Sequence, residues 1–222
     1  MSQAMSPAQQ QRLHERLSEG LAALEITATA AQLDQLLALV GLLHKWNRAY
    51  NLTAVRDPLD MVSRHVLDSA AVLPWVKGPR VLDVGAGPGL PGLVLAILNP
   101  ELDVSLLDSN GKKVRFQRQA VMELGLARVT PIQARVEAYT PADGGFDQLI
   151  SRAFASLEDF VELTRPLLAP HGQWLAMKGP AVDGELERLE DDVRCVSRHA
   201  LRVPYESAGR ELVMLEPEAG GR

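Results

Sequence analysis

Residues 81–92 carry the sequence VLDVGAGPGLPG, and this stretch decides the fold. A short β-type run ends at Gly85, and Gly85, Gly87 and Gly89 then alternate through a turn before an apolar helix over 93–98. Glycines are needed where a ligand approaches the backbone without a Cβ in the way and where φ is positive. A strand, a glycine-rich turn and a helix in this order therefore predict a ligand-binding loop.

The spacing of the glycines discriminates between ligands. A dinucleotide fingerprint needs a glycine at the sixth position from Gly85, where this chain has Leu90, and the phosphate-binding triplet Gly-Lys-Ser/Thr is absent from the sequence. An acidic residue, Asp83, lies two positions before the first glycine. This arrangement resembles the first motif of class I S-adenosylmethionine-dependent methyltransferases.

Short β-type runs alternate with helix-compatible segments from residue 78 onward, which is typical of a parallel sheet wound with helices. We expect an α/β fold of the class I methyltransferase type, a Rossmann-like doubly wound sheet in residues 78–222, with an N-terminal helical cap in residues 1–77. The expected strands are Arg80–Val84, Val104–Leu107, Val129–Ile132, Gln148–Ile150 and Trp174–Met177, with two more in the tail at Leu201–Val203 and Leu212–Leu215.

Three helix starts are visible in the cap. Ser6 and Thr29 each precede a Gln by three residues, which is the capping-box spacing, and Asp57 precedes a Pro in the first turn. Helices are therefore predicted to begin near residues 7, 30 and 58. Leucines at helical spacing along 33–43 predict that the second of these helices is packed on most of its circumference.

Carboxylates follow the second and third expected strands. Asp108 lies 19 residues beyond Gly89, where doubly wound nucleoside-binding proteins place a carboxylate on the ribose hydroxyls. Val136 and Glu137 follow the third strand, where this fold receives an adenine ring, and a helix N-cap or a surface position is the structural alternative for these acids. Three strand ends thus converge on one adenosyl group.

Composition excludes several classes of protein. The 222 residues are 46% hydrophobic and 23% charged, as in ordinary globular proteins, and the net charge of −5 requires any nucleic-acid binding to be local. One cysteine, Cys195, can form neither an internal disulfide nor a structural zinc site, so we expect no metal. We also expect a cytoplasmic protein with no membrane partner, because neither a bilayer-length apolar stretch nor a signal-like N-terminus is visible.

The exit of the fourth strand bears on the reaction type. It lacks the Asn/Asp-Pro-Pro-aromatic signature of methyltransferases that act on exocyclic amines. C5 methylation of pyrimidines needs a thiolate, but Cys195 is far in sequence from every strand exit, and we expect it to be buried in an acidic helical region with a structural role. A nucleophile with an in-plane lone pair, such as guanine N7, needs only proximity and alignment.

Seven motifs occur in order over residues 44–180 and together resemble the bacterial ribosomal RNA small subunit methyltransferase G family, also called glucose-inhibited division protein B. They are His44-x-Trp46-Asn47, Asn51-Leu52-Thr53-Ala54, Arg64-His65-x-Leu67-Asp68-Ser69, the glycine loop, Asp108-Ser109-x-x-Lys112-Lys113, Ser151-Arg152-Ala153-Phe154 and Met177-Lys178-Gly179. Gly111 before the lysine pair is a mild departure.

The resemblance implies a 16S rRNA (guanine-N7)-methyltransferase that uses S-adenosylmethionine on one guanine of the decoding region. The substrate would be 16S ribosomal RNA, the small subunit or an assembly intermediate, and no obligate protein partner is expected. With the glycine-loop and ribose assignments above, the expected cofactor-binding residues are Gly85, Gly87, Gly89, Leu90, Asp108, Val136, Glu137 and Arg152.

Two groups of polar residues are expected on the substrate side. Phosphate contacts are expected from Arg56, Arg64, Lys112, Lys113 and Arg115, for each of which a solvated side chain is the structural alternative. No residue is assigned as a catalytic acid or base, and the candidates for positioning the substrate are Asn51, His65, Arg152 and Lys178.

Two other functions compete with this one. A nicotinamide-dependent dehydrogenase shares the sheet and Asp108 but fails the glycine spacing and lacks room for a substrate domain. A non-catalytic RNA-binding or division-associated adaptor would have no need of the loop from Gly85 to Gly89 together with Asp108 and Glu137.

Overall fold

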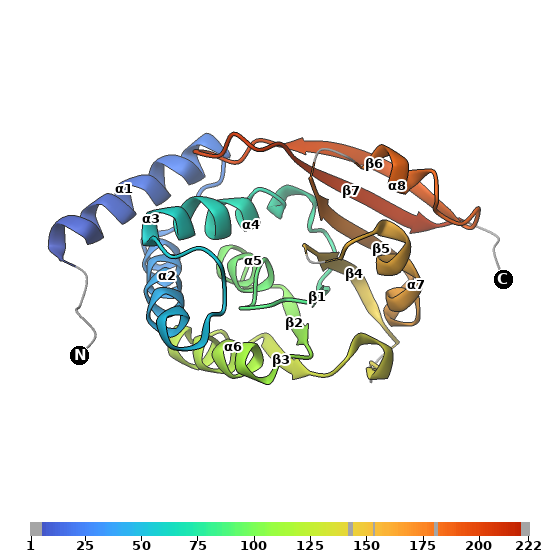
Figure 1. Ribbon diagram of the computed structural model, residues 1–222, viewed down its shortest axis with the longest axis horizontal. Helices are drawn as coiled ribbons and strands as arrows, with labels where there is room; N and C mark the ends of the chain where they lie inside the picture. Colours follow the sequence, from blue (N-terminus) through green and yellow to red (C-terminus); the bar gives the residue numbers. More distant parts are fainter. Residues whose placement is uncertain (1–5, 142–143, 153, 180–181, 219–222) are drawn as a thin grey trace.

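The computed structural model of the chain describes residues 6–141, 144–152, 154–179 and 182–218. Its sheet has the strand order β3-β2-β1-β4-β5-β7-β6 (Figure 1). β1 to β5 are parallel, and β7 runs antiparallel to both of its neighbours. The strands are β1 (Arg80–Val84), β2 (Asp103–Asp108), β3 (Val129–Gln133), β4 (Phe146–Ser151), β5 (Leu168–Lys178), β6 (Val193–Leu201) and β7 (Arg210–Pro217). The expected doubly wound α/β fold is confirmed.

The helices divide unequally between the two faces of the sheet. One face carries α5 (Gly92–Leu98) and α6 (Gly111–Leu124). The cap helix α2 (Ala30–Tyr50) packs on both of them, and α1 (Pro7–Ala23) packs on α2. The other face carries α7 (Leu157–Thr164), the short η4 (Arg165–Leu167) and η3 (Val136–Ala138), and α8 (Asp183–Leu186). The sheet is therefore buried between a thick helical layer and a thin one.

The three predicted helix starts in the cap are confirmed. Ser6 and Thr29 each form a capping box with the Gln three residues later, and Asp57 accepts hydrogen bonds from the backbone of residues 59 and 60. The third helix is irregular, because α3 (Pro58–Met61) continues into a π-helical stretch, η1 (Val62–Leu67), and then into α4 (Asp68–Ala70) and η2 (Leu73–Trp75).

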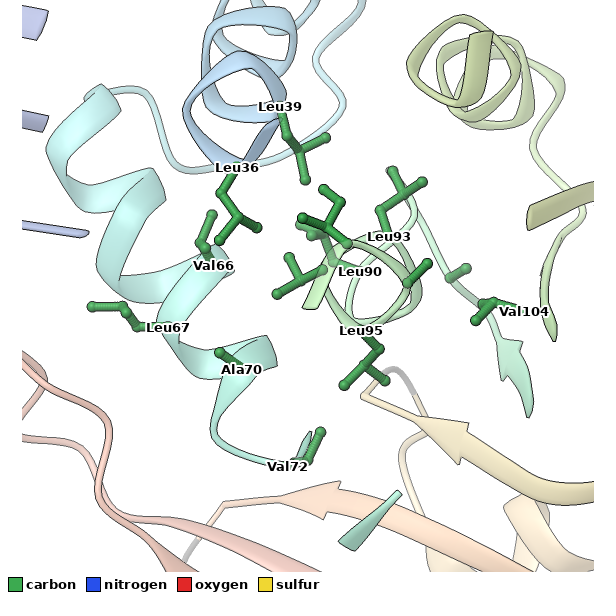
Figure 2. Close-up of a cluster of buried hydrophobic side chains, with 14 of the residues drawn as sticks. Leu36, Leu39, Val66, Leu67, Ala70, Val72, Leu90, Leu93, Leu95 and Val104 are labelled. Carbon is green, nitrogen blue, oxygen red and sulfur yellow. The ribbon is translucent and has the colours of Figure 1, made fainter. Parts of the chain in front are cut away.

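Cap and sheet share one hydrophobic core. Figure 2 shows Leu36 from α2, Val66 from η1 and Leu93 from α5 in one buried cluster, to which Val104 of β2 also belongs. Leu36 and Leu93 are fully buried. The boundary at residue 77 stays a prediction, and the packing joins its two sides closely.

Two expectations for the strands and their connections are wrong. No α-helix follows β3 within the described residues, where only the three-residue η3 precedes β4. The tail strand expected at Leu201–Val203 is β6, which lies earlier and ends at Leu201, whereas the strand expected at Leu212–Leu215 lies within β7. β6 forms the edge of the sheet. Its apolar and polar residues alternate poorly, because this exposed strand carries many charged and polar side chains.

The acidic region before Cys195, and Cys195 itself, differ from the expected helix. Only α8 is helical in the acidic run Asp183–Asp192, which is largely exposed, and four of the acids in this run form ion pairs: Asp183 with Arg198, Glu185 with Lys178, and Glu190 and Asp192 with Arg165. Cys195 lies exposed on β6, the edge strand of the sheet, and is not buried in a helix.

The loop between β6 and β7 connects the tail to the cap. Tyr205 donates from its hydroxyl to Glu19 at 3.1 Å, and the guanidinium of Arg16 lies 4.4 Å from the centre of the Tyr205 ring. Glu206 pairs with Arg64 at 3.7 Å. These contacts place the beginning of β7, at Arg210, beside the cap.

Candidate functional site

The glycine loop follows β1 at the carboxyl end of the parallel strands. Gly85, Gly87 and Gly89 have φ values of 67°, 58° and 87°, a region that residues with a Cβ adopt at a cost. A Cβ on Gly89 would also lie 2.5 Å from Leu93 Cδ1, whereas a Cβ on Gly87 would meet only Lys113 Nζ, at 3.9 Å, and Gly85 O. Gly89 is thus required for packing and Gly87 for backbone conformation.

Two buried carboxylates hold this loop. Asp83 Oδ2 accepts a hydrogen bond from Gly92 N at 2.7 Å, at the start of α5. Asp108 Oδ2 accepts from Gly87 N and Oδ1 accepts from Asn110 N, each at 2.8 Å. Each carboxylate oxygen keeps a second lone pair, so Asp108 can still accept from ligand hydroxyls.

Burial raises the pKa of Asp83 to about 7, an effect that the Gly92 N–H and the charge of Arg152 partly oppose and the charge of Asp108 adds to. Its Oδ1 is buried and has no hydrogen-bond partner among the described residues. Asp83 is therefore partly protonated near neutral pH.

A first hollow of about 270 Å³ opens beside the loop, at the ends of β1, β2 and β3. Four of the eight expected cofactor residues line it: Gly85, Asp108, Val136 and Glu137. The sequence reasoning missed Ala134, Phe154 and Leu163, apolar side chains that complete the wall. Ala134 and Phe154 come from strand exits at which the sequence already predicted site residues. Leu163 lies on α7, which sequence spacing does not connect to the loop.

The other expected cofactor residues do not line the first hollow. Gly87 and Gly89 lie in the loop, and Leu90 is buried in the core between cap and sheet (Figure 2), with its N–H donating to the carbonyl of Ala86 at 2.9 Å. Arg152, at the exit of β4, lines a second hollow instead.

The second hollow, of about 420 Å³, lies between the cap and the ends of β4, β5 and β7. Its lining includes three of the four positioning candidates, His65, Arg152 and Lys178, but not Asn51. It also includes Asp68 and Arg210, which the sequence reasoning did not single out as site residues. The full lining is Thr53, Ala54, Val55, Arg64, His65, Asp68, Arg152, Met177, Lys178, Gly179 and Arg210.

A buried carboxylate organises the arginines of the second hollow. Asp68 Oδ2 lies 3.0 Å from Arg152 Nη1, and its Oδ1 lies 3.3 Å from Arg210 Nε. Arg152 also donates to the carbonyl of Arg64 at 3.4 Å. Asp68 thus joins the cap, the exit of β4 and the tail, and it leaves both guanidinium groups with further N–H donors.

His65 is a neutral side chain in this wall. Its Nδ1 lies 3.0 Å from the carbonyl of Arg64 and its Nε2 lies 2.8 Å from Thr53 Oγ1, so Nδ1–H donates and Nε2 accepts from the hydroxyl. Burial chiefly, with the charge of Arg152 and a smaller effect of the charge of Arg64, lowers the pKa of His65 to about 4, and the hydrogen bond to the backbone of Arg64 opposes this shift. Buried Asn47 fixes the loop that carries Thr53, because its Oδ1 accepts from Thr53 N and its Nδ2 donates to the carbonyl of Val55.

Lys178 and Asn51 are already engaged by neighbouring groups. Lys178 Nζ donates to the carbonyls of Phe154 and Ala155 at 3.2 and 3.1 Å and pairs with Glu185 at 2.8 Å, which uses its three donors. Asn51 is the left-handed C-cap of α2, and its Oδ1 accepts from Arg56 at 2.8 Å. Lys178 thus holds the segment that carries Phe154, and Asn51 ends a helix.

The expected RNA-binding residues lie in two places. Lys112 and Arg115 are exposed on α6, and Lys113 is half-buried with its ammonium group near Gly87. Arg56 and Arg64 are exposed on the cap, where Arg64 pairs with Glu206. Within the part of the chain that the structure describes, Lys112, Lys113 and Arg115 form no ion pair.

Neither a metal site nor a membrane-spanning helix is present among the described residues. No group of three or more His, Cys, Asp or Glu side chains is arranged to hold a metal ion. In the same ranges, no helix combines the length and the apolar character needed to span a membrane.

The sequence is similar to a family of known proteins. A family model described as rRNA small subunit methyltransferase G matches residues 32–214. The chain is 64% identical over 200 residues to the Ribosomal RNA small subunit methyltransferase G of Chromohalobacter salexigens, covering 90% of this chain and 95% of that protein. It is 51% identical over 205 residues to the protein of that name from Pseudomonas syringae pv. syringae, covering 92% and 95%.

A solved structure shares the fold. The SAM-dependent methyltransferase from Thiobacillus denitrificans in complex with S-adenosyl-L-homocysteine is similar with a TM-score of 0.50 at 13% identity, covering 68% of this chain and 90% of that one.

Proposed function

Because the chain belongs to the rRNA small subunit methyltransferase G family, we propose that it transfers the methyl group of S-adenosylmethionine to N7 of a guanine in 16S ribosomal RNA, in the decoding region. Family membership makes it an S-adenosylmethionine-dependent methyltransferase of small-subunit ribosomal RNA. The motif resemblance and the chemistry of the site support the proposal that the acceptor is N7 of a guanine.

The observation that carries the proposal is the pair of hollows beside the exit of β4. Phe154 lines the first hollow and Arg152 lines the second, and the two residues belong to the same segment after Ser151. A methyl donor in the first hollow and an acceptor base in the second would meet at this segment. Methyl transfer depends on such an approach, because the reacting atoms must come within about 3–3.5 Å in line.

The residues of the first hollow fit S-adenosylmethionine. Gly85 presents a wall without a Cβ, Asp108 faces the hollow with unused lone pairs, and Val136 and Phe154 provide apolar surface for a purine. We assign the ribose to Asp108 and the adenine side to Val136 and Glu137. When bound, S-adenosylmethionine supplies an electrophilic methyl group on a sulfonium ion.

The second hollow suits an acceptor that loses no proton. His65 is neutral and uses both ring nitrogens, Asp68 is paired with two arginines, and Lys178 has three partners. Among the described lining residues, none is an unengaged general base. Guanine N7 attacks with a lone pair that is already in the ring plane, so placing the base is sufficient.

RNA contacts are proposed on both sides of the hollows. Arg56 and Arg64 on the cap and Lys112, Lys113 and Arg115 on α6 would neutralise backbone phosphates, which provides affinity rather than sequence choice. The proposed substrate is 16S ribosomal RNA, the small subunit or an assembly intermediate, and the proposed location is accordingly the cytoplasm.

Isothermal titration calorimetry tests the cofactor assignment. We expect the full chain to bind S-adenosylmethionine and not NAD, and Asp108→Ala to weaken binding by at least about tenfold, because ribose hydroxyls lose their acceptor. Gly87→Val should also abolish binding, because a β-branched residue resists φ near 58°. Circular dichroism verifies that the variants fold. Binding of NAD alone, or parental affinity in both folded variants, would overturn the assignment.

A further inference from the structure

Gln117 is a buried polar side chain that the proposed mechanism does not use. It lies on α6 with no exposed surface, and its Nε2 donates a hydrogen bond to the carbonyl of Gly87 at 2.8 Å. The orientation of the amide follows from chemistry, because a carbonyl oxygen can accept only from the NH₂ side of the group. The contact joins the middle of the glycine loop to a helix that begins 24 residues later.

Gly87 is held at both of its polar atoms. Its N–H donates to Asp108 at 2.8 Å, and its C=O accepts from Gln117 at 2.8 Å. Two partners from different elements, β2 and α6, therefore set the plane of this residue's backbone. Because φ of Gly87 is 58° and glycine crosses readily between conformations, such external bonds are what selects one of them.

The rest of the Gln117 amide makes no compensating contact. Its Oε1 is buried and has no hydrogen-bond partner among the described residues. An unpaired buried oxygen is costly, and an apolar side chain of the same length would avoid that cost. What glutamine contributes at this position is therefore the bond to the Gly87 carbonyl.

We propose that Gln117 is a positioning residue that holds the glycine loop in its cofactor-binding conformation before S-adenosylmethionine arrives. The inference rests on the proposed function for the identity of the ligand. A loop that is already in its bound conformation spends no binding free energy on being ordered, so losing the bond reduces affinity by the fraction of molecules with a competent loop.

Gln117→Met removes the donor and keeps the length of the side chain. We expect the Kd for S-adenosylmethionine, measured by calorimetry on the full chain, to rise about tenfold, the effect of one hydrogen bond. In methylation assays on small ribosomal subunits, KM for S-adenosylmethionine should rise. KM for the subunit and kcat at saturation should stay at the parental values, since Gln117 touches no reacting group.

Gln148→Met is the matched control. Gln148 is also buried, but it lies on β4 and bonds to the backbone of Trp75, Lys77 and Gly78 at the opposite end of the sheet. This variant should lower Tm, yet its folded form should bind S-adenosylmethionine with the parental Kd. A general effect of losing a buried glutamine would instead weaken binding in both variants.

Hydrogen exchange tests the positioning without the cofactor. Gly89 N and Leu90 N both donate to the carbonyl of Ala86 within the loop. These amides should exchange faster in free Gln117→Met than in the parent or in Gln148→Met. Parental exchange and parental Kd in Gln117→Met would overturn the proposal and leave Gln117 a packing residue. A parent chain that does not bind S-adenosylmethionine would instead contradict the proposed function, and the exchange rates would still decide the role of Gln117.

Discussion

At the scale of single residues, the site contains two buried groups whose pKa values differ strongly from those of the same groups in water. Asp83 has its pKa raised to about 7 and His65 has its pKa lowered to about 4, in each case chiefly by burial. Burial favours the neutral form of both groups. Around neutral pH, His65 therefore adds no positive charge to the second hollow, where Asp68 is paired with Arg152 and Arg210.

Asp83→Asn tests the raised pKa. The pKa of Asp83 lies near 7 in the folded chain and at 3.8 in a solvated carboxyl, so its contribution to stability is present below about pH 4 and is lost as the pH rises through 7. Asparagine has no such loss. The stability of the variant relative to the parent should therefore rise as the pH increases from 4 to 7. At pH 8 the gain should be on the order of 2–4 kcal/mol.

Urea unfolding at pH 4, 5.5 and 8 measures this gain. His65 is present in both proteins, so its own loss of stability as the pH falls from 6.5 toward 4 cancels in the difference. A difference in unfolding free energy that is constant across the three pH values would contradict the raised pKa.

At the scale of elements, α6 serves both the cofactor loop and the expected RNA surface. Gln117 faces Gly87 from inside, whereas Lys112 and Arg115 are exposed on the outside of the same helix. Asn110 caps the helix by accepting from Lys112 N at 3.0 Å. One amphipathic helix can therefore contact the cofactor loop with one face and the RNA with the other.

Lys112→Ala combined with Lys113→Ala tests the outer face of α6. Each lost phosphate contact should reduce the slope of log affinity against log salt by about one unit, with similar losses on all RNA sequences. Affinity for S-adenosylmethionine should remain within a few-fold of the parent. Methylation at limiting RNA should slow.

Lys77→Ala is the control, because Lys77 is exposed at the amino end of β1, away from the glycine loop. Filter binding of small-subunit RNA over a range of salt concentrations gives the slopes. If the double variant retains the parental slope, the α6 lysines are ordinary solvated side chains and the RNA docks elsewhere, with the cap as the remaining candidate.

Elements with local signals could be predicted from the sequence. The capping boxes at Ser6 and Thr29 and the alternating glycines after β1 depend on neighbours within a few residues, and the structure has them where expected. β6 could not be placed, because an edge strand with exposed charges lacks the alternation that marks a half-buried one. The same failure put Cys195 in a helix.

At the scale of the whole molecule, contacts between distant segments complete the site. Arg210 reaches Asp68 across 142 positions because the β6–β7 hairpin packs against the cap, and Leu163 reaches the first hollow from α7. No spacing rule relates such residues, so sequence reasoning found the strand exits and missed these partners. Cap and sheet share one core, and the cap therefore forms a wall of the second hollow.

The most direct test of the central claim is to locate the methyl group. Small subunits from cells that lack this protein would be incubated with the full chain and S-adenosylmethionine, and the RNA then treated with borohydride and aniline, which cleave the strand at N7-methylguanine. The account predicts a single new cleavage in 16S ribosomal RNA, at a guanine of the decoding region, that is absent without the cofactor and absent with Asp108→Ala. Methyl incorporation that leaves the RNA resistant to cleavage, or cleavage outside 16S ribosomal RNA, would contradict it.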